Sequence, residues 1–268
     1  MSRRLRPPGF VFTAMIFAYA FLYGPIVSLV IYSFNESKLV TVWGGFSTKW
    51  YGELLKNDAL LNAALQSFKI ATLSATVATV LGTLAAIALT RFGRFFGRSS
   101  MQGVLMAPLV MPEVLLGLTM LLLFVAMDQL IGWPHQRGLL TISIAHTTFT
   151  IAYVVVVMQS RLKTVDRSLE EAALDLGARP VKVFFLITLP LITPALLSSW
   201  LLAFTLSLDD LVIASFTSGP GSTTLPMIVF SSVRLGVNPQ INALATVLLL
   251  SVISGIVLAT WVTRKKSP

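Results

Sequence analysis

Long stretches without charged residues alternate with short polar segments along this chain of 268 residues. Three charge-free stretches, 10–32, 70–90 and 235–263, are long enough to cross about 30 Å of hydrocarbon as helices. Three more stretches are interrupted only by Glu113, by His146, or by Asp209 with Asp210. The pattern predicts six membrane-spanning helices, at 10–32, 68–90, 101–127, 139–160, from 191 onward, and 241–262, and a helix at 225–233 that is too short to span.

Composition agrees with a membrane location. The chain is 55% hydrophobic and only 12% charged, with a mean hydropathy of +0.82, whereas a soluble domain carries about 25% charged residues. We therefore expect an all-α integral membrane protein, with residues 1–268 forming one transmembrane domain surrounded by lipid.

Lysine and arginine predict the orientation, because cytoplasmic loops retain them. If the N-terminus is inside, the inner segments hold fourteen of the twenty basic residues. Both termini and the segment 161–190 are then cytoplasmic, and 33–61 is an outer loop. Ala18 and Ala20 imitate a signal-peptidase site, but the apolar run continues through Ile31 and favours an uncleaved helix. The net charge of +9 reflects topology, so we expect no nucleic-acid partner.

The polar segment 168–190 predicts a helix, a turn and a second helix. Ser168 and Glu171 have capping-box spacing, so a helix is expected to begin at Leu169. Gly177 is expected to end that helix, and Pro180 to begin the next one. On local grounds alone, this segment is an ordinary helix-turn-helix linker.

The same segment contains the spacing E-A-A-x3-G-x9-I-x-L-P from Glu171 to Pro190. This spacing resembles the cytoplasmic loop of permease subunits in binding-protein-dependent ABC importers. The resemblance implies a type I importer permease fold whose loop forms a coupling helix that docks on a separate ATPase. It implies that coupling residues lie at Glu170, Glu171, Ala172, Ala173, Asp175 and Gly177.

Acidic residues inside apolar spans are costly and need a partner or a water-filled cavity. Glu113 follows Pro112, so it either caps a restarted helix or faces a passage for cations. Asp209 and Asp210 are adjacent and point about 100° apart on a regular helix, which indicates a local break. Either both line the passage, or one caps the broken helix while the other is solvated at the outer mouth. His146 is interpreted as a packing and hydrogen-bonding residue in preference to a proton relay.

The outer loop 33–61 and the L-S-L-D-D-x-V stretch around Asp209 resemble the spermidine and putrescine members of that permease family. Trp43 and Trp50 in the loop are suited either to interfacial anchoring or to cation–π contact with substrate. A polyamine carries two to four positive charges, so we hypothesise that Glu113, Asp209, Asp210, Trp43 and Trp50 line its route.

Several classes of chemistry lack their motifs. The sequence has no cysteine, no phosphate loop ending in Gly-Lys-Ser/Thr and no HExxH, and its two histidines predict no metal cluster. No cofactor is therefore expected on this chain, and ATP and Mg²⁺ belong to partner subunits.

The resemblance implies a second permease, which is expected to be a different chain, two ATPases and a periplasmic polyamine-binding protein, in a bacterial inner membrane. It leaves the choice between putrescine and spermidine open. Two alternatives also stay open: a permease for another solute such as ferric iron or sulfate, and a secondary transporter or channel that uses the acids as proton sites. A membrane-embedded enzyme is disfavoured, because no nucleophile and base pair is visible.

Overall fold

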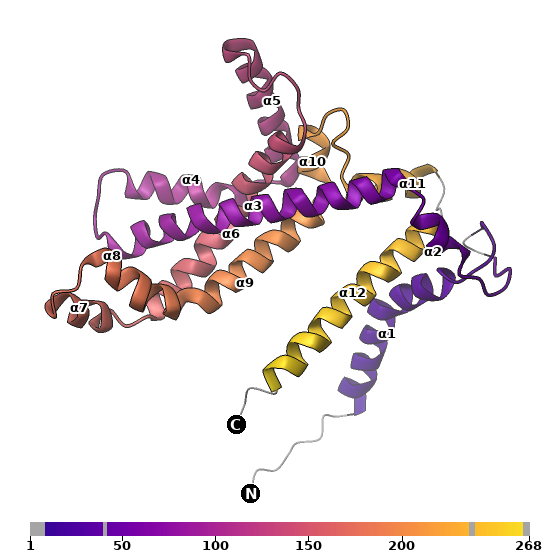
Figure 1. Cartoon of the computed structure of the whole chain (residues 1–268), viewed down its shortest axis with the longest axis horizontal. Coiled ribbons are helices and arrows are strands. Elements are labelled where there is room, and N and C mark those ends of the chain that lie inside the picture. Colours follow the sequence, from indigo (N-terminus) through magenta and orange to yellow (C-terminus); the bar gives the residue numbers. More distant parts are fainter. Residues whose placement is uncertain (1–8, 40–41, 236–238, 265–268) are drawn as a thin grey trace, which may run out of the picture. The chain divides into compact units, whose positions relative to one another are not determined.

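The computed structural model describes residues 9–39, 42–235 and 239–264, and the side chains of all of these except 235 and 255–264. Regular structure among the described residues is helical, apart from one isolated bridge between Asn35 and Phe46. Five helices are long and apolar enough to cross a membrane by length and composition (Figure 1). This confirms the predicted all-helical membrane fold.

The chain divides into two compact units, 1–61 with 229–268, and 62–228. The first unit contains α1 (Gly9–Tyr32), α2 (Lys49–Leu54) and α12 (Pro239–Arg264), and α12 packs against both other helices. No residue of α1 is buried, as expected of a helix whose apolar side chains face lipid or another protein. The expectation of a single domain stays a prediction.

The second unit is built on α3 (Asp58–Arg91), α6 (Leu139–Thr164) and α9 (Leu189–Leu208), which run side by side in Figure 1. Small residues let these helices approach closely. Ala75, Ala78 and Ala86 of α3 are fully buried beside Val154 and Met158 of α6. A Cβ added at Gly82 would lie 2.7 Å from Cγ1 of Val154, so this position requires glycine. The expectation that the alanine-rich helix is buried is confirmed.

The remaining elements of this unit are shorter or stand apart. They are α4 (Arg98–Val110), α5 (Glu113–Ile131), α7 (Ser168–Asp175), α8 (Pro180–Val183), the π turn η1 (Phe184–Thr188) and α10 (Val212–Thr217). The helix α11 (Leu225–Leu235) begins in this unit and continues into the first one. In Figure 1, α5 projects away from the row formed by α4, α3 and α6, and it packs closely against α10.

Three predicted boundaries were wrong. The span expected at 101–127 is two helices, because Pro112 disfavours helical geometry at the residue before it, and Met111 is extended at φ −77° and ψ 135°. The helix expected at 68–90 begins at Asp58. Its first turn is stabilised by Asn57, whose Oδ1 accepts a bond from the Leu60 N–H at 3.2 Å.

The third wrong boundary concerns the helix expected from residue 191. The helical path runs without interruption from Pro180 to Leu208, so Pro190 and Pro194 lie inside it. The π turn at Phe184–Thr188 directly precedes Pro190. Wider turns of this kind accommodate a proline by relaxing the regular α-helical hydrogen bonding around it.

Candidate functional site

The helix α7 begins with a different hydrogen bond from the one that the sequence predicts. No side-chain capping bond forms between Ser168 and Glu171, so the capping-box prediction was wrong. The Ser168 N–H instead donates to Asp166 Oδ1 at 2.9 Å, and this bond lowers the pKa of the Asp166 carboxyl. The carboxylate two residues upstream takes the place that the Ser168 hydroxyl was expected to fill.

The end of α7 is as predicted. Gly177 has φ +83°, a conformation that favours glycine. Its N–H donates to the Leu174 carbonyl at 2.9 Å, and the Ala178 N–H donates to the Ala173 carbonyl at 3.1 Å. This pair of bonds is the Schellman arrangement that satisfies the last helical carbonyls.

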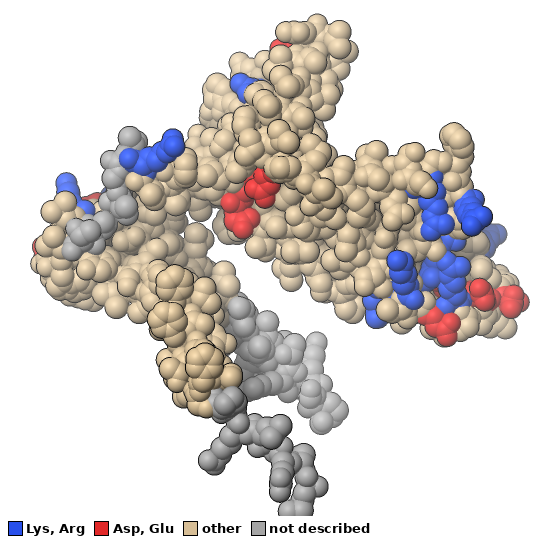
Figure 2. Space-filling view, turned by 180° about the vertical axis from the view of Figure 1, so that it is seen from behind, with Lys and Arg blue, Asp and Glu red and all other residues tan. Residues whose placement is uncertain are grey.

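The outer surface of α7 carries exposed apolar side chains. None of its residues is buried, and Leu169, Leu174 and Leu176 are 49%, 43% and 90% exposed. Glu171 and Asp175 are exposed beside them. Lys and Arg gather with acidic residues over this end of the second unit, where Figure 2 shows most of its charge. An apolar strip within a charged surface is typical of a protein contact site.

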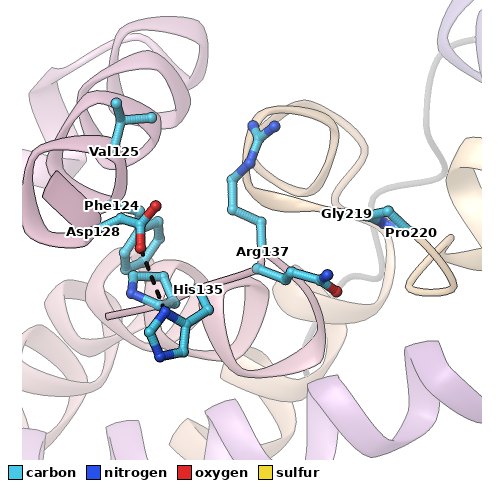
Figure 3. Close-up of a pocket in the computed structure, with 9 residues that line it drawn as sticks. Phe124, Val125, Asp128, His135, Arg137, Gly219 and Pro220 are labelled. Atoms are coloured by element: carbon cyan, nitrogen blue, oxygen red, sulfur yellow. Dashed lines mark ion pairs between the residues drawn. The ribbon is translucent and has the colours of Figure 1, made fainter. Parts of the chain in front are cut away.

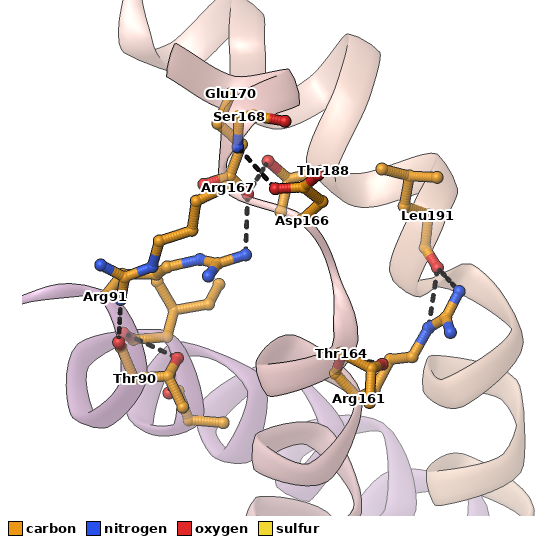
Figure 4. Close-up of polar contacts among 12 residues, drawn as sticks. Thr90, Arg91, Arg161, Thr164, Asp166, Arg167, Ser168, Glu170, Thr188 and Leu191 are labelled. Carbon is orange, nitrogen blue, oxygen red and sulfur yellow. Dashed lines mark hydrogen bonds and ion pairs between the residues drawn. The ribbon is translucent and has the colours of Figure 1, made fainter.

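Glu170 differs from its neighbours, because its side chain turns inward. Its Oε1 accepts bonds from Arg91 Nη2 at 3.1 Å and from Thr188 Oγ1 at 2.9 Å (Figure 4). The side chains of Arg91 and Glu170 are only 14% and 18% exposed. Glu170, which was expected to face the ATPase, therefore connects α7 to α3 and to the π turn, whereas Glu171 remains on the outside.

The predicted break at the paired aspartates is confirmed. The helix α9 ends at Leu208 and α10 begins at Val212. Asp210 is buried, and its Oδ1 accepts a bond from the Ala214 N–H in the first turn of α10 at 2.9 Å. Asp209 is exposed. The two carboxylates therefore have different surroundings, and this arrangement matches the alternative in which one aspartate caps and the other is solvated.

His146 of α6 reaches the same break. Its Nδ1 lies 2.7 Å from Ser207 Oγ, and its Nε2 lies 3.2 Å from Asp210 Oδ1. The second contact is close in distance but is not aligned as a hydrogen bond. This pair was not among the contacts predicted from the sequence. The signal was available, since a histidine and an acid interrupt two apolar spans that both need polar partners.

Glu113 is the first residue of α5 and is exposed. This position, directly after the break at Pro112, favours an acid at the positive end of the helix dipole. A few residues further along, a Cβ at Gly117 would lie 2.7 Å from Phe216 Cδ2, so α5 and α10 are in close contact. The structure thus brings the helix that begins at Glu113 against the short helix that follows Asp210.

The two tryptophans of the outer loop, in the first unit, are not equivalent. Trp50 is 3% exposed and donates from Nε1 to the Asn35 carbonyl at 2.6 Å, with Lys49 Nζ 4.8 Å from its ring centroid. Trp43 is 50% exposed and makes an edge contact with Tyr32. Trp43 is therefore accessible from outside, whereas Trp50 is buried and connects two parts of the loop.

A separate cavity of about 260 Å³ lies between α5 and the segment after α10 (Figure 3). Asp128 Oδ1 and His135 Nδ1, both in its wall, lie 3.9 Å apart, and Arg137 lies beside Gly219. None of the site residues predicted from the sequence lines this cavity. Within the described ranges, no group of three or more His, Asp or Glu side chains is placed to hold a metal ion.

Stacked apolar helices of this length are those of an integral membrane protein. Residues 78–267 match the family described as "Binding-protein-dependent transport system inner membrane component", and the chain belongs to this family of inner-membrane, multi-pass proteins. It is 64% identical over 235 residues to the putrescine transport system permease protein PotI of Escherichia coli strain K12, covering 88% of this chain and 84% of that protein.

A second relative and a solved structure extend the comparison. The chain is 42% identical over 267 residues to the spermidine/putrescine transport system permease protein PotC of the same strain, covering 100% of this chain and 97% of the relative. The crystal structure of a bacterial ABC transporter involved in the import of alginate matches 100% of this chain and 99% of its own with a TM-score of 0.71 at 19% identity. This structural likeness establishes the type I importer permease fold.

Proposed function

We propose that this chain forms half of the translocation pathway of an ATP-driven polyamine importer. The observation that carries the proposal is the 64% identity, over 88% of this chain, to a permease named for putrescine transport. The 42% identity to a spermidine/putrescine permease supports the same substrate class. A membrane passage for such cations needs acidic or aromatic groups in place of water.

The exposed helix α7 is the proposed docking site for a separate ATPase. The sequence has no phosphate-binding loop, so ATP and Mg²⁺ are assigned to two ATPase subunits. Leu169, Leu174 and Leu176 offer apolar contact, and Glu171 and Asp175 offer charge. Ala172, Ala173 and Gly177 supply the small residues and the turn that let a groove close around the helix.

The proposed cation route passes Glu113 and Asp209. Both acids are exposed within the second unit, at the start of α5 and at the end of α9. Asp210, whose carboxylate is engaged by His146 and by the Ala214 N–H, contributes to the route by fixing the break. A second permease would supply the other half, and a periplasmic binding protein would deliver the polyamine.

Reconstitution tests this function directly. The chain is assembled with its partner permease, ATPase and binding protein in proteoliposomes, and uptake of radiolabelled putrescine and spermidine is measured with ATP. A non-hydrolysable ATP analogue and omission of the binding protein serve as controls. We expect polyamine to accumulate only when ATP can be hydrolysed and the binding protein is present. Accumulation of sulfate or ferric iron without polyamine would overturn the assignment.

A further inference from the structure

The helix α7 has no fully buried residue, and side-chain polar contacts attach it to two other elements. The contacts that fix it come from the ends of two other elements, Arg91 at the end of α3 and Thr188 at the end of the π turn. A helix with no fully buried residue depends more on such polar contacts for its position than a helix with a buried face does.

Glu170 is the residue on which these contacts converge. A single oxygen, Oε1, accepts from the Arg91 guanidinium and from the Thr188 hydroxyl (Figure 4). Bonds to an ionised acceptor are about twice as strong as neutral ones. The pair is also largely shielded from water, and shielding reduces the screening that weakens exposed ion pairs. We call Arg91, Glu170 and Thr188 the Glu170 link.

A second contact connects the same two elements. The Arg167 guanidinium, one residue before α7, donates to the Thr90 carbonyl at the end of α3. This carbonyl belongs to the last turn of α3, where helical carbonyls lack partners within the helix. Two successive residues of α3, Thr90 and Arg91, therefore hold two residues at the start of α7, Arg167 and Glu170.

We propose that the Glu170 link makes α7, the end of α3 and the π turn move as one body when the ATPase acts on α7. The inference rests on the proposed docking of α7 to an ATPase. Glu170 is in this view a positioning residue that transmits displacement and does not touch the ATPase, whereas its neighbour Glu171 faces outward.

The elements beyond the link lead to the proposed route. The helix α3 packs against α6 through the glycine contact at Gly82, and α6 carries His146. The π turn continues directly into α9, which ends beside Asp209. Arg161 of α6 also donates from Nε and Nη2 to the Leu191 carbonyl of α9, at 3.1 and 2.8 Å. A displacement of α7 passed through Glu170 thus reaches α9, which ends at the aspartate break, and α6, whose His146 contacts Asp210.

Spin-label distances in the intact importer test whether these elements move together. The chain has no cysteine, so it carries labels only where cysteine is introduced. Labels at Arg94→Cys, in the loop directly after α3, and at Ser168→Cys, at the start of α7 and outside the proposed docking residues, report the separation of the α3 end from α7. We expect the same distance with and without ATP in the wild-type background, and a shifted or broader distribution on ATP binding in Glu170→Gln.

Uptake per ATP hydrolysed provides the functional readout. We expect Glu170→Gln to lower this ratio by about fivefold and Thr188→Val by about twofold, since each removes or weakens bonds of the link. The ATPase should still co-purify. The charge exchange Arg91→Glu with Glu170→Arg should recover part of the ratio, and Thr188→Ser most of it. Arg94→Gln, which changes an exposed arginine outside the link, is the matched control.

The outcomes separate this proposal from the function on which it rests. If the wild-type chain does not retain the ATPase, the docking assignment fails and the link proposal fails with it. If the wild-type complex works and Glu170→Gln leaves both the label distances and the ratio unchanged, only the link proposal is overturned. If the Glu170→Gln importer does not assemble, Thr188→Val provides the test, because this variant keeps the ion pair between Arg91 and Glu170. An unchanged uptake per ATP hydrolysed in Thr188→Val would then refute the link.

Discussion

His146 and Asp210 form a contact inside the helical bundle, with Nε2 of one 3.2 Å from Oδ1 of the other. Their side chains are 1% and 3% exposed. Asp210 also accepts the Ala214 N–H, and His146 also contacts the Ser207 hydroxyl. The contact therefore joins α6 to both sides of the break between α9 and α10.

Removing one partner of this contact should destabilise the protein. Asp210→Ala or His146→Ala leaves a buried polar group without one of its partners, which costs about 1–3 kcal/mol. The double variant should cost less than the sum of the two single variants, by about 0.5–3 kcal/mol. Thermal unfolding of the purified importer measures the stability losses of the single and double variants. Asp209→Ala is the control, and its free energy of unfolding should lie within about 0.5 kcal/mol of wild type. A stability loss in the double variant equal to the sum of the two single losses would contradict the contact.

The exposed acids should affect transport without affecting assembly. Glu113→Gln and Asp209→Asn each remove one charge from the proposed cation route. A unit charge contact is worth about 1 kcal/mol in water and more at lower dielectric, so kcat/KM for polyamine uptake should fall about fivefold or more. Asp128→Asn, in the separate cavity, should change uptake less than about twofold. Normal uptake kinetics in both Glu113→Gln and Asp209→Asn would show that these acids do not line the route.

The close approach of α3 and α6 should not tolerate a methyl group. Gly82→Ala places a Cβ 2.7 Å from Val154 Cγ1, and overpacking of this kind costs about 1–3 kcal/mol. Val154→Ala in the same chain should restore much of the lost stability. Gly103→Ala of α4 meets nothing within 4 Å and serves as the control. Equal melting temperatures for both alanine variants would show that the helices are further apart than this.

The turn after α7 should depend on backbone conformation alone. A side chain at Gly177 meets nothing within 4 Å, but the φ of +83° is unfavourable for other residues by about 1–2 kcal/mol. Gly177→Ala should therefore weaken ATPase co-purification and uptake, and Gly177→Asn should do so less, since asparagine tolerates this conformation better. Equal losses of co-purification and uptake in the two variants would indicate that Gly177 acts through its small size instead.

The start of α7 should respond to acid through Asp166. Its pKa is lowered by the bond from the Ser168 N–H, so its contribution to helix stability is present at neutral pH. That contribution is lost as the pH falls through the lowered pKa of the folded state. Hydrogen exchange at α7 should rise for Asp166→Ala at neutral pH and change little for Asp166→Asn, whose amide oxygen still accepts. Identical exchange in all three proteins would rule out this cap.

The hydrophobic pattern predicted most of the helices, because runs such as the one at α6 leave few alternatives. It failed where proline acts through its neighbours. Pro112 breaks a span that was expected to be continuous. Pro190 lies in the first turn of α9, but the helical path continues upstream of it through the π turn. Such outcomes depend on the surrounding helices, which a local pattern does not describe.

The sites were predictable as segments and not as individual side chains. The sequence placed a break at the aspartates, but only the folded chain shows that Asp210 turns toward His146 while Asp209 turns outward. It likewise placed Glu170 and Glu171 on one short helix, and a rotation of one residue decides which of them faces Arg91. Adjacent residues of the same type have the same local propensity, so their directions are set by tertiary partners.

The π turn at Phe184–Thr188 fixes the rotational phase between α7 and α9. A π turn closes its hydrogen bonds over five residues and so holds one residue more than an α-helical turn, which corresponds to about 100° of rotation. With that extra residue, Thr188 faces Glu170 while Ile192 and Ser199 remain buried along α9. A one-residue deletion here would turn the surface helix away from its partners although every contact residue was still present. Changes of length are therefore less tolerable in this turn than changes of side chain.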